Sequence, residues 1–226
     1  MEMELVLDYL RDLAAHNNRE WYQETRKRRM AACQAFEALI SELMVSLRKK
    51  QGIIPLMEPK KLTFKMVRDT RFSHDKSPYN PVFRAHIGPM GKQPIPVGYF
   101  LMISPENQSF LGGGLFADLF KDATTMVRDA ISSQGREWEE MITAPDFKAH
   151  FTVKGKALKR VPQGYDKDHP QGEYLKNKSW YLEYPVSDRQ ILKKDFIETA
   201  TDVFMKMQDF NDFLNRALEG FEMPTR

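Results

Sequence analysis

The sequence of 226 residues has little of several features that mark common protein classes. Its one cysteine, Cys33, can form neither an intrachain disulfide nor a cysteine-based zinc site. It has no uninterrupted run of 18 apolar residues, and its acidic start is not typical of a signal peptide. A formal net charge of +3 is too small by itself to indicate a nucleic acid or membrane partner. These absences predict a cytoplasmic protein without a membrane-spanning helix.

The composition is that of a folded globular protein. Hydrophobic residues make up 42% and aromatic residues 12% of the chain, enough to bury a sizeable core. There is no internal repeat, and no linker is long enough to separate two domains. The apolar patterns run as helices, strands and helices again, with one late strand, which is not a βαβ alternation. We therefore predict a single α+β domain over residues 1–226, with N-terminal and C-terminal helices packed on an antiparallel sheet.

Apolar residues recur with a helical period near both ends of the chain. Asn17 is predicted to cap a long helix that ends at Gly52, with Glu20 completing a capping box. Other helices are predicted over residues 3–15, 118–134, 138–142 and 188–220.

Two features of the long helix receive a structural interpretation. Its basic run, residues 26–29, is interpreted as a solvated face. Cys33 lies among small apolar residues and is predicted to be a packed thiol that reagents reach slowly.

Alternating apolar and polar residues predict strands in the middle of the chain and one near its end, and the more continuous apolar run at 97–103 predicts a central strand. Closely spaced Pro and Gly residues between them indicate antiparallel neighbours. The three glycines at 112–114 match neither GxxxxGK[ST] nor GxGxxG, and we interpret them as a turn into the next helix. The predicted strands are 62–67, 83–87, 97–103, 109–111, 158–161 and 180–184.

The apolar stripes of these elements also predict the core. Nine large or branched side chains should be buried if the helix and strand faces are assigned correctly. They are Trp21, Phe36, Leu43, Phe100, Leu101, Val127, Ile131, Phe204 and Phe213.

Residues 68–81, the central segment, carry the strongest functional signal. The segment joins two predicted strands and is too long for a tight hairpin, and long ordered connections are often functional. Residues 60–84 contain seven cations and two acids, a net charge of +5 that exceeds the +3 of the whole chain. The positive charge of the chain is therefore concentrated in this region.

Two interpretations of the central segment stay open at this level. Its acids could pair with its cations and only stabilise an irregular loop. Alternatively, surplus cations bind phosphate or carboxylate, to which arginine offers a bidentate fork and hydroxyl groups offer neutral donors. The candidate ligand-binding residues are Arg68, Asp69, Arg71, Ser73, Asp75, Lys76 and Tyr79.

Under both interpretations the central segment should be ordered. We expect Phe72 and Tyr79 to bury their rings, because a segment with two aromatics and two prolines favours packing. Asp69 and Asp75 should then be hydrogen-bonded to backbone N–H groups or to neighbouring cations, since an unpaired buried charge is costly.

No catalytic or metal-binding pattern stands out. Ser73, His74 and Asp75 are the residue types of a catalytic triad, but consecutive side chains cannot easily align as nucleophile, base and orienting group. The histidines have neither HExxH nor HxH spacing, although His74 with two nearby aspartates leaves a metal site open. We predict no cofactor and no metal, and whether the protein is an enzyme stays undetermined.

Four motifs in a fixed order suggest a relationship. They are NNREW at 17–21, RDxRFSxDKxPY at 68–79, GGG at 112–114 and LKRxPxGY at 158–165. With them the chain resembles, over nearly its whole length, a bacterial and fungal family of conserved hypothetical proteins, domain of unknown function 2461. The resemblance implies a single α+β domain of about this size and no established reaction.

The chain departs from the family pattern in two places. The family usually has Asn-Lys where this chain has Thr25-Arg26, and a lysine where it has Gln163. A ligand contact made by that lysine in relatives would be missing here.

The leading functional hypothesis is a cationic polar pocket, built from the seven candidate residues, for a small phosphate- or carboxylate-bearing ligand. The alternative is a protein- or nucleic-acid-interaction module that uses basic runs at 26–29 and 154–160, with a purely structural central segment. A pocket needs its cations in a concavity, whereas an interaction module needs its basic runs on one flat or convex face. Nucleic acid and membrane partners are not expected, and both the oligomeric state and the role of loop 154–165 stay open.

Overall fold

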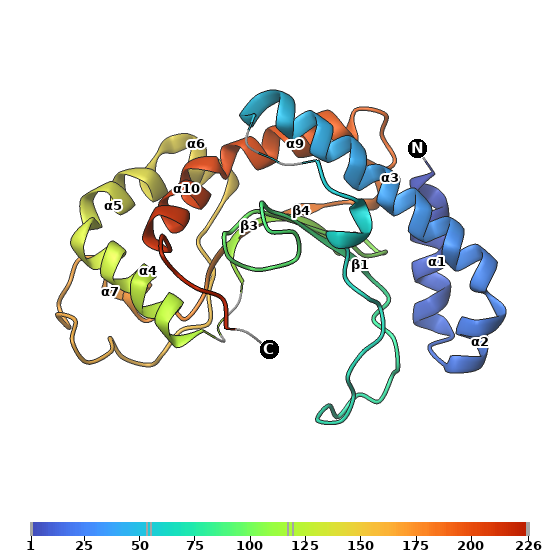
Figure 1. Ribbon diagram of the computed structural model, residues 1–226, viewed down its shortest axis with the longest axis horizontal. Coiled ribbons are helices and arrows are strands. Elements are labelled where there is room, and N and C mark those ends of the chain that lie inside the picture. The colour runs from blue at the N-terminus through green and yellow to red at the C-terminus, as the bar shows by residue number, and fades with distance from the viewer. Residues whose placement is uncertain (1, 53, 55, 117, 119, 225–226) are drawn as a thin grey trace.

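The computed structural model describes residues 2–52, 54, 56–116, 118 and 120–224. These residues form a four-stranded antiparallel sheet with helices before, between and after its strands (Figure 1). The strands are β1 (Phe83–Ile87), β2 (Tyr99–Ile103), β3 (Ser109–Leu115) and β4 (Trp180–Val186). The helices are α1 (Met3–Ala15), α2 (Arg19–Glu24), α3 (Arg26–Gln51), η1 (Pro59–Lys61), α4 (Lys121–Ser133), α5 (Gly135–Thr143), α6 (Pro145–His150), α7 (Gly172–Leu175), α8 (Asp188–Ile191), α9 (Phe196–Lys206) and α10 (Gln208–Ala217). The predicted α+β class with an antiparallel sheet is confirmed.

The sheet has the order β1-β2-β3-β4, so β2 and β3 are central and β1 and β4 form its edges. Helix α3 contacts β1, and α9 and α10 contact β3. On β2, Leu101 and Ile103 are buried whereas Phe100 and Met102 are half-exposed. The helices therefore cover one face of the sheet. The opposite face, which we call the open face, has no helix beneath it among the described residues in Figure 1.

The elements are arranged as an arch (Figure 1). Helices α1 to α3 lie toward one end and α4 to α7 toward the other, with the sheet and α9 and α10 between them. A long loop before β1 extends from the underside of the arch.

Helix α3 is long and apolar enough to cross a membrane by length and composition alone, a test that the core helix of a soluble protein also passes. Its apolar residues are buried at helical spacing, as Phe36, Leu39, Leu43 and Leu47 show. They pack against α1 and α9. The apolar character of α3 is thus accounted for by core packing.

The second predicted helix differs from expectation near its start. It is interrupted at Thr25, and the N-cap of α2 is Asn18, whose side chain accepts a hydrogen bond from the Trp21 N–H. Asn17, the predicted cap, instead bonds to a distant segment described below. The predicted end of the long helix is confirmed, since Gly52 is the C-cap of α3 with a left-handed φ of 68°.

Two strand predictions and one turn prediction need correction. Residues 62–67 form no strand and pair only through isolated bridges at Thr63 and Val67, because this part of the chain soon diverges from the sheet. Residues 158–161 form no strand either. The glycines at 112–114 are not a turn, since β3 continues through them to Leu115.

Seven of the nine predicted core side chains are buried. The exceptions are Trp21 and Phe100, which are half-buried. Trp21 packs on the surface against Tyr9 and His16, with ring centroids 5.8 Å and 5.7 Å away. Phe100 belongs to the open face, so its position follows from the missing second layer.

His86 gives the fold a pH dependence. Its side chain is 6% exposed on β1, and Nδ1 lies 2.7 Å from the Gly91 carbonyl oxygen. Burial lowers its pKa below the ordinary value of 6.5, against the opposing effect of that hydrogen bond. The unfolded chain therefore takes up the proton first, and stability should fall as the pH is lowered from 6.5 toward the folded-state pKa.

We expect the melting temperature to fall on acidification through this window and to fall less in His86→Gln. The control is His74→Gln, because His74 is exposed and should leave the slope of melting temperature against pH unchanged. Equal slopes in His86→Gln and the parent would contradict the assignment.

Candidate functional site

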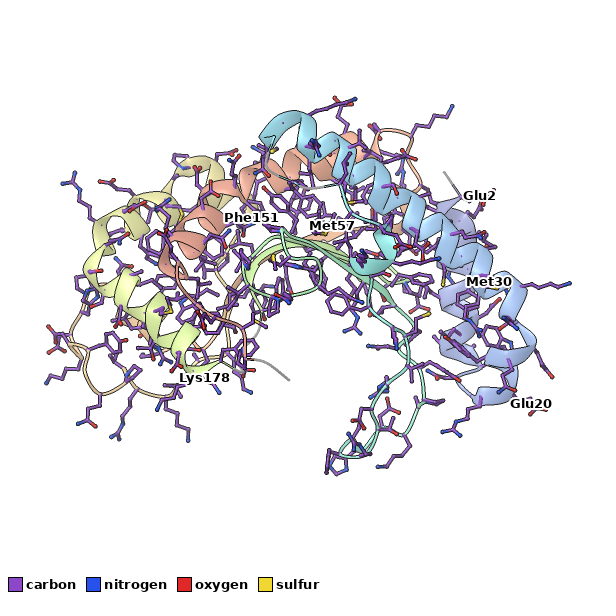
Figure 2. All side chains as sticks on the ribbon, in the orientation of Figure 1. Glu2, Glu20, Met30, Met57, Phe151 and Lys178 are labelled. Carbon is purple, nitrogen blue, oxygen red and sulfur yellow. The ribbon has the colours of Figure 1, made fainter. Side chains whose placement is uncertain are left out.

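The loop at residues 63–82, which we call the arm, joins η1 to β1. At its base Thr63 bridges Ala85, and further out Val67 bridges Tyr79. Beyond these bridges the arm extends away from the sheet, and Figure 2 shows its tip with no other part of the chain packed around it. The central segment therefore forms most of a projecting structure.

Arg68 and Asp75 form an ion pair across the arm. Arg68 Nη2 also lies 3.3 Å from Ser73 Oγ, and Asp75 Oδ1 accepts a 2.9 Å hydrogen bond from the Ser77 N–H. Hydrogen bonds from Ser77 and from the Arg68 guanidinium hold the pKa of Asp75 well below its usual range. Asp75 is therefore a permanently ionised internal partner of the arm.

A second pair stabilises the turn at the arm tip. The Arg71 guanidinium donates to both oxygens of Asp69, with Nη2 2.6 Å from Oδ2. The backbone N–H of Arg71 donates to Oδ1 at 3.1 Å. Lys76 Nζ donates to the Thr70 carbonyl at 3.0 Å. The prediction that Asp69 and Asp75 each bond to a cation or a backbone N–H group is confirmed. Most of the positive charge of the central segment is therefore paired with carboxylates of the same segment.

The prediction that both rings of the arm are buried is wrong for Phe72. Its side chain is 96% exposed, whereas Tyr79 is 8% exposed. The tip has no second layer of structure to pack against, so only the ring at the base finds partners. The ion pairs of the arm consequently form in solvent.

Tyr79 anchors the arm to the N-terminal helices. Its N–H donates to Asn17 Oδ1 at 3.1 Å, and Asn17 Nδ2 donates to its carbonyl oxygen at 2.9 Å. Its ring stacks on Tyr22 with centroids 3.7 Å apart and planes 11° apart. Two of the motifs noted in the sequence, at 17–21 and 68–79, thus meet in space.

A groove of about 380 Å³ lies between α3 and the base of the arm. The buried side chains that line it are apolar, and its three lysines are exposed. The lining residues are Tyr22, Arg29, Cys33, Phe36, Glu37, Lys60, Thr63, Phe64, Lys65, Met66, Val67, Phe83 and Lys92.

Four cations and one acid line this groove. The cations are Arg29, Lys60, Lys65 and Lys92, and the acid is Glu37. Within the described part of the chain, no Asp or Glu oxygen lies within 4.0 Å of any of the four cations. The groove therefore holds a surplus of positive charge that no ion pair among the described residues offsets.

Arg29 is held in place by Tyr22. Its Cζ lies 3.8 Å from the Tyr22 ring centroid, and its Nη1 donates to the Tyr22 carbonyl. Since Tyr79 stacks on the same ring at 3.7 Å, the two planar groups must occupy opposite faces. The guanidinium is thus preorganised at the groove, with further N–H donors available.

Cys33 is less enclosed than the sequence predicts. It is half-buried and lines the groove. Desolvation raises the pKa of its thiol, with a further rise from Glu37 that the Arg29 charge opposes. The thiol is therefore a weak nucleophile at neutral pH, but it faces the groove and can report on its occupancy.

The seven candidate residues and the groove are different parts of one structure. Arg68, Ser73 and Asp75 cluster in the arm, Asp69 pairs with Arg71, and Lys76 and Tyr79 contact other partners. None of the seven lines the groove. Sequence reasoning missed Arg29 and Lys92, although the charge excess over residues 60–84 already included the other two lysines of the groove.

The other basic runs do not join the groove as a group. In the run 26–29, Arg28 pairs with Asp12 of α1 and Arg29 is half-buried, so this is not simply a solvated face. Residues 154–160 lie at the opposite edge of the sheet, where Lys154 bridges Tyr181 of β4. Loop 154–165 and the central segment are therefore separate regions.

Comparison with known families identifies the family of the chain. The family described as conserved hypothetical protein (DUF2461) matches residues 5–213, which spans the sheet, the arm and the groove. The chain belongs to this family. No curated protein and no solved structure matches it. The family carries no described activity, so the function has to be argued from the geometry of this member.

The described residues offer no metal centre. Among them, no group of three or more His, Cys, Asp or Glu side chains is placed to hold a metal ion. In particular, Asp69 and Asp75 are each engaged by an arginine.

Proposed function

We propose that the groove between α3 and the arm binds a small phosphate- or carboxylate-bearing ligand. The observation that carries this proposal is the set of four cations lining one groove, none of which has an Asp or Glu oxygen of the described residues within 4.0 Å. Like charges gathered in a concavity raise the local potential and attract an anion. The preorganised Arg29 offers a planar fork, and the lysines offer point charges.

The floor of the groove indicates what else the ligand contains. Phe64 and Met66 from the arm, with Phe36 and Phe83 beneath, form an apolar surface. A ligand with an anionic group and an apolar or aromatic body satisfies both parts of the groove. Phenyl phosphate is a suitable probe, because phenol has the same ring without the charge.

The test uses Cys33 as the reporter, since it is the one cysteine of the chain and lines the groove. Phenyl phosphate should slow the reaction of Cys33 with a thiol reagent and raise the melting temperature, and phenol should do neither. A ligand at one hundred times its Kd stabilises by about 2.7 kcal/mol, which corresponds to about 5–10 °C for a chain of this length.

The charge requirement is tested with paired variants. Lys65→Gln with Lys92→Gln should abolish both effects of phenyl phosphate. Lys193→Gln with Lys194→Gln removes the same charge from exposed positions outside the groove and should retain them. Equal protection of Cys33 in both double variants, or none in the parent at millimolar phenyl phosphate, would count against the proposal.

A further inference from the structure

An aromatic strip crosses the open face of the sheet. Phe64 lies 6.1 Å from Phe100, Phe100 lies 5.1 Å from Phe116, and Phe116 lies 4.4 Å from Tyr181, measured between ring centroids. Phe110 flanks the strip, 5.7 Å from Phe100. The strip thus runs without a break from the arm beside β1 to the opposite edge strand β4.

The rings of the strip are not core residues. All five are half-buried, whereas Tyr99 and Leu101, which face the helices, are fully buried. Gly112 lets the Phe116 ring lie against the strand backbone, since a Cβ there would lie 2.9 Å from that ring. A contiguous aromatic surface left partly in water marks a binding site more often than a folding requirement.

Charge is concentrated at both ends of the strip. Residues 60–92, which include the arm and β1, contain eight cations and two acids, a net charge of +6. Residues 154–160, which adjoin Tyr181 on β4, contain four cations and no acid, a net charge of +4. The remainder of the chain therefore carries −7, so the positive charge is concentrated in the two segments that adjoin the ends of the strip.

Two carboxylates near the β4 end are already paired. Glu183 lies 2.6 Å from Lys154 Nζ, and Asp118 lies 3.0 Å from Lys156 Nζ and 3.6 Å from Lys178 Nζ. These pairs offset the charges of Lys154 and Lys156, which leaves Lys159 and Arg160 as the cations of this segment that have no such partner among the described residues.

We propose that the open face binds single-stranded nucleic acid, with bases stacked on the aromatic strip and phosphates held by the flanking cations. The four β-strands span about 14 Å across the sheet, so the open face has room for more than one base. A duplex hides the faces of its bases, whereas a single strand exposes them. A second copy of the chain fits poorly, because the same positive segments would face each other.

This inference does not depend on the anion groove, although the two sites share Phe64, Lys65 and Lys92 at the arm end. A second cavity of about 710 Å³, lined by these three residues and the C-terminal segment, continues outward from the groove. A nucleic acid strand bound on the open face can therefore extend toward the groove, whereas its bases stack on the aromatic strip.

The experiment measures fluorescence anisotropy of labelled oligo-dT, oligo-U and a duplex of equal length with the full chain. Both single strands should bind more tightly than the duplex, and affinity should fall with rising salt. Tyr181→Leu and Phe116→Leu should each weaken binding by about tenfold or more.

The matched control is Tyr184→Leu, because Tyr184 is on the same strand as Tyr181 but pairs with Leu111 on the helix-covered face. It should leave binding unchanged, and the melting temperature of each variant establishes that it is folded. Absence of salt-dependent binding, equal binding of duplex, or equal losses in Tyr181→Leu and Tyr184→Leu would overturn the proposal. Protection of Cys33 by phenyl phosphate, measured in Tyr181→Leu, tests the groove separately and should persist.

Discussion

Gly114→Ala should be among the most destabilising single substitutions in this protein. Gly114 has a φ of +95°, which side-chain-bearing residues rarely adopt. A Cβ at this position would lie 2.4 Å from the Trp180 carbonyl oxygen and 2.7 Å from Phe210 Cε1. Neither atom can move without disturbing the β3–β4 pairing or the buried α10. We expect a loss of about 3 kcal/mol or more, seen as a melting temperature lower by about 6–12 °C.

The control for this prediction is Gly164→Ala. Gly164 has a similar φ of +100°, but a Cβ there would meet nothing within 4 Å. It should show only the backbone cost, about 1 kcal/mol. If both variants melt at the same temperature, the tight packing around β3 is not the source of the effect.

Tyr79→Ala should release the arm from the body of the protein. The substitution removes a ring that is 8% exposed and stacked on Tyr22, so it should cost about 3 kcal/mol. Because the ring holds the arm against the N-terminal helices, brief proteolysis should cut the variant within residues 63–82 well before the parent. The variant should also lose the effect of phenyl phosphate on Cys33, since the arm forms one wall of the groove.

Tyr79→Phe separates the ring from its hydroxyl group. The two bonds between Tyr79 and Asn17 use only the Tyr79 backbone, and the stacking on Tyr22 needs only the ring. The free energy of unfolding of Tyr79→Phe should therefore lie within about 1 kcal/mol of that of the parent, and its arm should stay resistant to protease. A Tyr79→Ala protein whose arm stays resistant would show that other contacts hold it.

Local signals in the sequence predicted the elements that depend on near neighbours. The apolar period of residues 3–15 became α1, and the long helix ends at Gly52 as predicted. Alternation predicted β1 and a continuous apolar run predicted β2, and the two strands pair along their full length. The same alternation failed at residues 62–67, because a strand also needs a neighbour, and the arm leaves the sheet there.

The central segment illustrates the same division. Its ion pairs join residues two to seven positions apart, so their partners could be inferred from the sequence. The exposure of Phe72 could not, since it depends on whether another element lies over the arm tip. The glycines of β3 were misread for a related reason: their neighbours come from distant helices and from β4.

The α+β class, the family and the concentration of positive charge after residue 60 could be inferred from the amino-acid sequence alone. They follow from composition, periodicity and short motifs, which act over a few residues. Which cations meet in a groove and which aromatics share an uncovered face became known only from the packing of the elements. Arg29 and Lys92 are brought together from α3 and from the turn after β1, and Phe64 and Tyr181 come from opposite edges of one sheet. Such convergence depends on how packed elements are oriented, and no local pattern encodes it.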